Sequence, residues 1–242
     1  MIQILPQHLQ HKIAAGEVVE RPASVIKELV ENALDAHATR VSVEIIGGGI
    51  DRIVVRDDGI GMDRADAELA FQRYATSKLA TEEDLFRIAT FGFRGEALAS
   101  IAAVSEVTLE TRQAESLTGT RVVMSGGVRQ ASEACGCSAG TRITVSKLFF
   151  NTPARRKYLK AVQTEHRHCL EAVIDQAIIR PEIGFNFASN ERVFFDCPAG
   201  QEHAERLADV LGSEWADGIL GVEHEAWPYA VRGFIGRPEK AR

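Results

Sequence analysis

Residues 20–36 read ERPASVIKELVENALDA, and this stretch decides the fold. Pro22 suits the first turn of a helix, because no backbone N–H is needed there. Apolar residues then recur at helical spacing and predict one buried side; they are Ile26, Leu29, Val30, Ala33 and Leu34. We therefore expect an amphipathic helix that packs on a core.

Opposite the apolar side lies a narrow polar stripe of Glu28, Glu31, Asn32 and Asp35. Such a stripe is usually a solvated surface. Asn, however, is a mediocre helix former and a good neutral oxygen ligand for a metal ion. A carboxylate one turn before it could hold a water beside a metal-bound phosphate. The stripe alone leaves both interpretations open.

The composition suits a folded domain with a substantial core. The chain has 242 residues, of which 45% are hydrophobic, and this length suits one large domain or slightly more. No apolar run reaches membrane-spanning length, and residues 1–6 lack the charged and apolar regions of a signal peptide, so we expect a cytoplasmic protein that does not contact membranes. The net charge of −6 argues against a dominant nucleic-acid surface, although a local basic groove is compatible with it. The cysteines lack a second pair at metal-binding spacing, which predicts free thiols; they are Cys135, Cys137, Cys169 and Cys197.

Two predicted strands at 41–46 and 52–57 form a hairpin around the turn at 47–49. The second strand runs into DDGIGM at 57–62. Glycines at positions 59 and 61 allow the backbone to approach a ligand closely, while the Asp57 carboxylate accepts a hydrogen bond from it. A plain strand-to-helix turn capped by Asp is the alternative interpretation.

A predicted helix at 64–73 is followed by the polar stretch 74–84, which has little core of its own, as expected of a lid. Residues 90–101 then predict a glycine-bearing loop that runs into a helix. The backbone N–H groups of such a loop and the N-terminus of the helix favour an anion, which predicts a phosphate site at 92–95. A helix start with ordinary caps is the alternative.

The rest of the chain predicts further sheet and helix. Strands are expected at 104–111, 120–125, 127–132 and 141–148, a long helix at 163–180 and a hairpin over 185–195. The basic stretch 155–160 suits phosphate, an acidic partner or a solvated loop. We expect a first domain at 1–198, whose arm at 1–19 packs on its own core or reaches a partner, and an incomplete second domain at 199–242.

Four motifs resemble those of the GHKL ATPases, a superfamily that includes gyrase B subunits, certain chaperones, histidine kinases and the MutL proteins. They are ELVENALDA at 28–36, DDGIGM at 57–62, GFRGEAL at 92–98 and GT at 140–141. Within this superfamily, AAGEVVERPAS at 14–24, ATSK at 75–78 and FNTPARRK at 150–157 look like the MutL family of DNA mismatch-repair proteins. The resemblance implies an α/β (α+β) Bergerat fold, a two-layer sandwich of helices on one mixed, mainly antiparallel sheet. No GxxxxGK[ST] or HExxH motif occurs, so nothing favours a P-loop or a zinc peptidase. GCSAG at 136–140 matches GxSxG, but it lies between two predicted strands and not at a strand-to-helix turn, so it does not favour a serine hydrolase.

The resemblance also implies roles for single residues with the cofactors ATP and Mg²⁺. Glu28 would be the general base that orients the attacking water, and Asn32 would bind Mg²⁺, which bridges the phosphates. Asp57 would accept from the adenine amino group, with Thr141 helping. The other residues expected to contact the nucleotide or to belong to its lid are Ala36, Gly59, Gly61, Met62, Ser77, Lys78, Gly92, Phe93, Arg94, Gly95 and Leu98, with the Arg94 and Glu96 side chains holding the glycine loop.

At the level of the whole protein, the resemblance implies an ATP-gated dimeric clamp. ATP would order the lid and the N-terminal arm and join two copies, which couples a mismatch-recognition protein of the MutS type to a downstream nuclease or helicase. DNA binding would be weak and nonspecific, and the protein would be nucleoid-associated. The alternative is a nucleotide-gated interaction module in which ATP binding alone signals. Proteins of this kind take a γ-phosphate lysine from a second domain, in a motif resembling H-P-x-K, and no such motif occurs up to residue 242. We therefore expect these residues to bind ATP, but to hydrolyse it poorly and dimerise poorly.

Overall fold

The computed structural model describes residues 3, 6, 15, 16, 18–77, 92, 95–213 and 218–237. Its main element is a sheet of eight strands: β1 (Arg40–Ile46), β2 (Arg52–Asp57), β3 (Glu106–Arg112), β4 (Gly119–Ser125), β5 (Val128–Cys135), β6 (Gly140–Ser146), β7 (Gly184–Ser189) and β8 (Arg192–Cys197). Their order across the sheet is β5-β4-β3-β6-β2-β1-β7-β8. Strands β1 and β7 run parallel, and every other neighbouring pair in this sheet is antiparallel. The predicted mixed, mainly antiparallel sheet is therefore confirmed.

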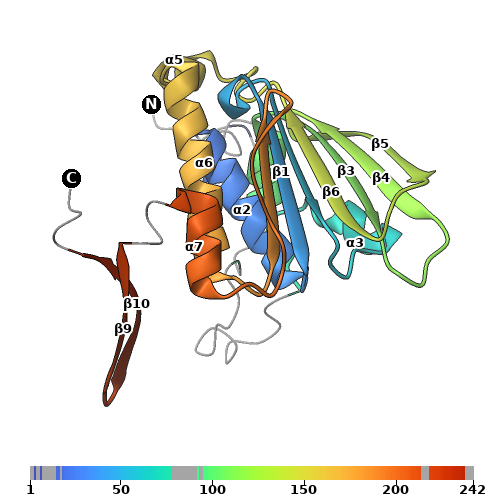
Figure 1. The fold of residues 1–242 in the computed structure, drawn as a ribbon. Coiled ribbons are helices and arrows are strands. Elements are labelled where there is room, and N and C mark those ends of the chain that lie inside the picture. Colours follow the sequence, from blue (N-terminus) through green and yellow to red (C-terminus); the bar gives the residue numbers. More distant parts are fainter. Residues whose placement is uncertain are drawn as a thin grey trace.

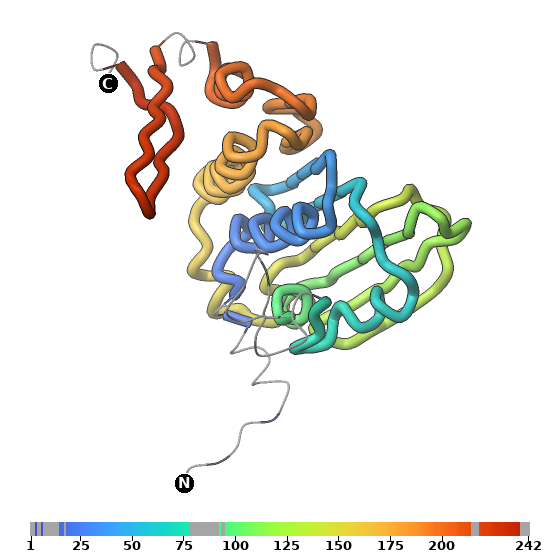
Figure 2. The backbone as a smooth tube through the Cα atoms, turned by 90° about the horizontal axis from the view of Figure 1, so that it is seen from below, coloured from blue at the N-terminus to red at the C-terminus, as the bar shows by residue number. Residues whose placement is uncertain are grey.

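Helices cover one face of this sheet (Figure 1). The helices that the structure describes are α2 (Pro22–Asp35), α3 (Arg64–Leu69), α4 (Ala97–Ala103), α5 (Pro153–Tyr158), α6 (Val162–Ile179) and α7 (His203–Leu211), with a short 3₁₀ turn η1 (Gly47–Gly49) between β1 and β2. Helix α2 lies beside α6 in the middle of this layer (Figure 2). The layered arrangement is the predicted two-layer sandwich. None of the helices that the structure describes is long and apolar enough to cross a membrane.

The core lies between α2 and the sheet, as the apolar spacing of residues 20–36 predicted. Helix α2 buries Val25, Ile26, Leu29, Val30 and Ala33. The central strands alternate buried and more exposed residues, because successive side chains of a strand point to opposite faces. The end of the N-terminal segment joins this core through Ala15 and Val19, both fully buried. The rest of the predicted arm lies largely outside the described residues.

One predicted element is shorter than expected. The helix predicted at 64–73 ends as α3 at Leu69, and a turn follows it. After the C-cap Ala70, the N–H of Gln72 bonds to the carbonyl of Leu69, three residues back, so the chain continues as a turn and not as an α-helix. Phe71 is buried all the same, so the apolar spacing reflected burial rather than helix at this position.

Helix α7 packs against α6 and β8 beside the main sheet (Figure 1). Beyond it, β9 (Ile219–Ala226) and β10 (Tyr229–Gly236) pair antiparallel as a separate two-stranded sheet. Figure 2 shows this hairpin projecting away from the sandwich, on the side of α7. The domain boundary at 198/199 stays a prediction, and α7 lies just beyond it in sequence.

Candidate functional site

The polar stripe of α2 is not a fully solvated face. Glu28, Glu31, Asn32 and Asp35 are all half-buried, and the Glu31 side chain retains only 12% of its exposure. Each of the four takes part in a polar or electrostatic interaction. The stripe therefore faces other parts of the protein, as a binding site on this side of α2 requires.

Two predicted motifs meet at the C-terminal end of α2. The Asp35 carboxylate Oδ2 accepts a hydrogen bond from the backbone N–H of Gly92, at 3.2 Å. The carbonyl of the next residue, Ala36, accepts from the N–H of Ile60, at 3.0 Å. Adjacent residues of one helix end thus contact the glycine loop and the turn after β2. The three predicted polar elements form one cluster.

Asp57 stands at the end of β2 with one carboxylate oxygen engaged and the other available. Its Oδ1 accepts from the N–H of Gly59 at 2.9 Å and from the N–H of Thr141 at 3.2 Å. Among the described residues, no group donates a hydrogen bond to Oδ2. Burial raises the pKa of Asp57 to about 6 and the charge of Asp58 adds to this, although the two backbone bonds oppose it. At neutral pH this carboxylate is therefore charged, mostly buried and short of one donor.

The glycines after Asp57 permit very close packing. A Cβ on Gly59 would lie 2.5 Å from the Ala36 carbonyl oxygen, and one on Gly61 would overlap the carbonyl of Arg112. Gly61 also has a φ of 66°, which disfavours a side chain. The two glycines were predicted to let the backbone approach a ligand. In this structure they let it approach other backbone segments of the same chain. This close packing clamps the turn between the end of α2 and the end of β3.

Thr111 is a site residue that the sequence analysis missed. Its buried hydroxyl accepts from the N–H of Met62 at 2.9 Å, donates to the carbonyl of Gly140 at 3.0 Å, and lies 3.1 Å from the hydroxyl of Thr141. Thr111 and Thr141 are direct partners across β3 and β6. The sequence shows only a threonine at the end of a strand. Its role becomes visible once the strand register places it opposite Thr141.

The described residues at the end of the glycine loop contact those at the start of the lid. The N–H of Tyr74 donates to the Gly95 carbonyl at 2.9 Å, and Arg73 pairs with Glu96 at 3.8 Å. Glu96 thus contacts the segment before the lid, and its role in holding the loop stays a prediction. Helix α4 begins directly after it, and Leu98 packs partly buried against the core. Ser77 is exposed, whereas Lys78, Phe93 and Arg94 lie outside the described residues.

The side-chain oxygens of the stripe suit a hard metal ion that also binds ligands from elsewhere. Glu28 and Asn32 offer carboxylate and amide oxygens, the ligand type that Mg²⁺ prefers. No group of three His, Cys, Asp or Glu side chains in the described part of the chain could hold a metal ion by itself. Mg²⁺ commonly takes few protein ligands and completes its shell with phosphate oxygens and water, so the residues fit a nucleotide-bound ion. The four cysteines are free thiols, as predicted.

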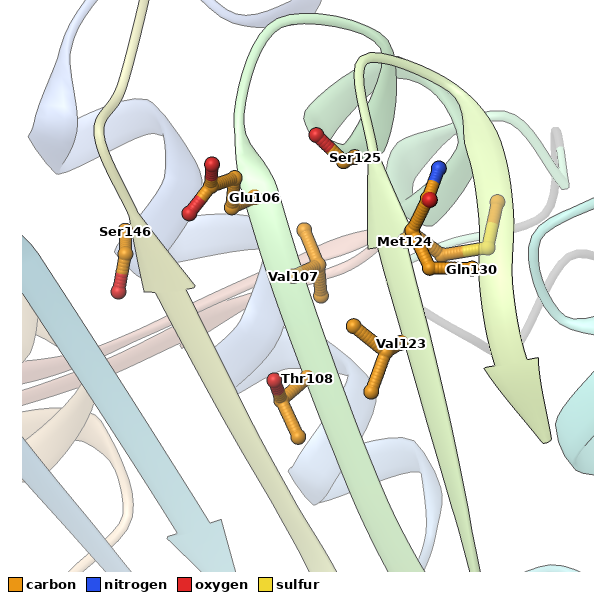
Figure 3. Close-up of a pocket in the computed structure, with 8 residues that line it drawn as sticks. All are labelled: Glu106, Val107, Thr108, Val123, Met124, Ser125, Gln130 and Ser146. Atoms are coloured by element: carbon orange, nitrogen blue, oxygen red, sulfur yellow. The ribbon is translucent and has the colours of Figure 1, made fainter. Parts of the chain in front are cut away.

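A separate open depression of about 370 Å³ lies on β3, β4, β5 and β6. Figure 3 shows residues that line it, among them Glu106, Thr108, Val123 and Ser146. None of its lining residues belongs to the cluster around Asp57 and α2. The depression is therefore not the candidate site.

Comparisons with known proteins identify the family of the chain. Residues 20–135 match the family described as histidine kinase-, DNA gyrase B- and HSP90-like ATPase. The chain is 50% identical over 241 residues to the DNA mismatch repair protein MutL of Symbiobacterium thermophilum, covering all of this chain and 38% of that protein. It is 48% identical to MutL of Geobacter sulfurreducens, again over the whole chain and over 40% of that protein. The chain thus spans about two fifths of the length of these curated relatives.

A solved structure extends the likeness to three dimensions. The ATPase domain of Aquifex aeolicus MutL complexed with ADP superposes with a TM-score of 0.69 at 32% identity. The match covers 91% of this chain and 78% of that domain. The sandwich of helices on a mainly antiparallel sheet is thus shared with that ATPase domain. The chain belongs to the MutL family of DNA mismatch-repair proteins and carries an ATPase domain of the GHKL type.

Proposed function

We propose that this protein binds ATP together with Mg²⁺ on the helix side of its main sheet and hydrolyses it slowly. The base lies against Asp57 and Thr141, with Gly59, Gly61 and Met62 shaping that end. The phosphates lie toward Asn32 and the loop at 92–95. Family membership and the ADP bound to the Aquifex relative support this reading.

The observation that carries the proposal is the convergence at the end of α2. Asp35 bonds to Gly92 and Ala36 bonds to Ile60, so the glycine loop and the turn after β2 flank one helix end. A ligand that contacts both must have an amine-bearing end for Asp57 and an anionic end for the loop. A nucleoside triphosphate has both.

Two residues of α2 have separate roles in metal binding and hydrolysis. Asn32 lies one turn before Ala36 and Glu28 one turn earlier still, which separates Glu28 from Ala36 by about 12 Å along the helix. Bound Mg²⁺ neutralises phosphate charge and fixes the phosphates in position. Asn32 offers its side-chain oxygen toward that ion. Glu28 holds the attacking water as general base at the far end of the site from the adenine.

At the level of assembly, nucleotide binding orders the lid and joins two copies into a clamp. The clamp links a mismatch-recognition protein of the MutS type to a downstream nuclease or helicase, with weak and nonspecific contact to DNA. The exposed cations of α5 and its neighbourhood, Arg156, Lys157 and Lys160, suit such a contact. The alternative, in which ATP binding alone signals, rests on the same site and differs only in the need for hydrolysis.

Replacement of Asn32 by Ala tests the metal-dependent part of the site. We expect wild-type protein to bind a non-hydrolysable ATP analogue in a calorimetric titration with Mg²⁺, and to bind it far more weakly when the Mg²⁺ is chelated. In Asn32→Ala the Mg²⁺-dependent gain falls about tenfold or more, because an oxygen ligand is lost. Lys27→Ala is the control on the same helix, since this side chain is exposed and its removal leaves the amide in place. An unchanged Mg²⁺ dependence in Asn32→Ala contradicts the assignment.

Replacement of Glu28 by Ala separates slow hydrolysis from signalling by binding alone. We expect phosphate release to fall by about 10²- to 10⁴-fold with little change in ATP affinity, because a general base acts in the transition state. Glu171→Ala, which removes an exposed carboxylate on α6, keeps its turnover. A mismatch-repair assay in cells that lack their own MutL then decides between the two functions. Full repair by Glu28→Ala favours the binding module over the hydrolysing clamp.

A further inference from the structure

We propose that Thr111 sets the hydrogen-bonding polarity of the base-binding end and thereby its preference for adenine over guanine. The inference rests on the proposed function and assigns a role to a residue that does not itself touch the nucleotide. Thr111 acts through Thr141 and is a positioning residue. Its side chain is fully buried at the end of β3, directly opposite Thr141 on β6.

The three contacts of the Thr111 hydroxyl fix where its proton goes. A hydroxyl has one proton to donate and two lone pairs that accept. The N–H of Met62 can only donate, so the Thr111 oxygen accepts from it. The carbonyl of Gly140 can only accept, so the Thr111 proton points to that carbonyl. The remaining contact, 3.1 Å to the Thr141 hydroxyl, must therefore be donated by Thr141.

Thr141 therefore has no proton left to donate to a ligand. Its hydroxyl proton is committed to Thr111, and its backbone N–H is committed to Asp57 Oδ1. What its side chain can still do is accept. Asp57 is the cross-strand partner of Thr141, and its second carboxylate oxygen can likewise only accept when charged. The two neighbouring groups thus form an end of the site that accepts hydrogen bonds and donates none.

An acceptor-only end distinguishes the two purine bases. Adenine carries an exocyclic amino group that donates, whereas guanine carries a carbonyl oxygen at the corresponding position. Guanine would place an acceptor against two acceptors and leave buried polar atoms unpaired, which is strongly unfavourable. If Thr111 lost its hydroxyl, the Thr141 proton would be free to turn toward the ligand. Guanine would then meet one acceptor and one donor, and the preference for adenine would weaken.

The test measures the dissociation constants of non-hydrolysable ATP and GTP analogues with Mg²⁺. Three proteins are compared: wild type, Thr111→Val, which has nearly the same shape but no hydroxyl, and Thr111→Ser, which restores the hydroxyl. We expect wild type to prefer ATP, Thr111→Val to lose about tenfold or more of the ATP-to-GTP affinity ratio, and Thr111→Ser to recover most of it. The ratio is the informative quantity, because general loosening of the fold weakens both nucleotides together.

Two results would overturn the inference. One is a Thr111→Val protein that retains the wild-type ratio; the other is a Thr111→Ser protein that loses it as fully as Thr111→Val. Thr141→Val provides a second route, because it leaves the bond between Met62 and Thr111 in place, and a wild-type ratio in that variant also overturns the inference. Failure of the proposed function looks different, since wild-type protein would then bind neither nucleotide.

Discussion

Asp57→Asn is expected to abolish ATP binding and to stabilise the nucleotide-free protein at the same time. The amide oxygen of Asn must occupy the Oδ1 position, because the N–H groups of Gly59 and Thr141 both donate there. The amide nitrogen then replaces Oδ2 and presents a donor to the adenine amino group, which is also a donor. We expect affinity for the ATP analogue to fall by about a hundredfold or more.

The gain in stability follows from the pKa of the carboxyl group. Burial is the largest cause that raises the pKa of Asp57, from 3.8 to about 6. A folded-state pKa above the unfolded value means that the fold favours the protonated form. The stabilising contribution is complete below about pH 3.8 and is lost as the pH rises through 6. Above that pH the ionised carboxylate costs at most about 3 kcal/mol, since each pKa unit corresponds to about 1.4 kcal/mol.

Denaturant unfolding of wild type and Asp57→Asn at pH 7.5 and near pH 4 measures this difference. We expect the variant to be more stable at pH 7.5 and the advantage to vanish near pH 4. Asp58→Asn is the matched control. Burial raises the pKa of Asp58, but hydrogen bonds from Thr39 and from the N–H of Arg40 outweigh it, and the net shift is downward. Its replacement therefore reduces stability at pH 7.5. A destabilised Asp57→Asn protein at that pH would contradict the claim that the buried, ionised Asp57 carboxylate destabilises the nucleotide-free fold.

Arg206→Ala is expected to destabilise the fold strongly. Arg206 lies on α7 with no exposed surface, and its five N–H donors lie within hydrogen-bond distance of five backbone carbonyls and the side-chain oxygen of Gln201. The carbonyls belong to Ala177, Arg180, Pro181, Ile183 and Pro198. The guanidinium carbon also lies 6.0 Å from the centre of the Phe185 ring. One side chain thus joins α7 to the end of α6 and to the segments before β7 and after β8.

Removal of this side chain leaves buried carbonyls without donors and a cavity at the junction. We expect a loss of about 3–5 kcal/mol in the free energy of unfolding, measured in urea. Arg206→Lys recovers only part of it, because an ammonium cannot reproduce the planar fork of five donors. Arg192→Ala is the control, since this arginine is exposed and only stacks on Phe194. A loss below about 1 kcal/mol in Arg206→Ala would show that α7 is not tied to the main sheet in this way.

The local elements could be predicted from the sequence because each carries its own signal. The spacing of residues 22–34 determines one buried face of α2, and the glycines at 47–49 mark the turn between β1 and β2. Strand order could not be predicted in this way. Strand β6 lies between β3 and β2, and β7 joins β1 in parallel, through pairings of residues far apart in the chain.

The motifs of the candidate site could be read from the sequence, but the contacts between them could not. Asp57, Asn32 and the glycine loop stand out by residue type, whereas Thr111 depends on strand register and is an ordinary strand residue in sequence. Arg206 is a similar case, because arginine is almost never fully buried and a surface position is the default expectation for it. In both cases the sequence does not reveal which atoms the side chain contacts.

The most direct test of the nucleotide site is a calorimetric titration of the protein with a non-hydrolysable ATP analogue and Mg²⁺, run beside Asp57→Asn. We expect about one nucleotide per wild-type chain and no measurable binding to Asp57→Asn, whose fold is intact and more stable. Equal binding by the two proteins would place the nucleotide elsewhere, and no binding by wild type would contradict the proposed function itself.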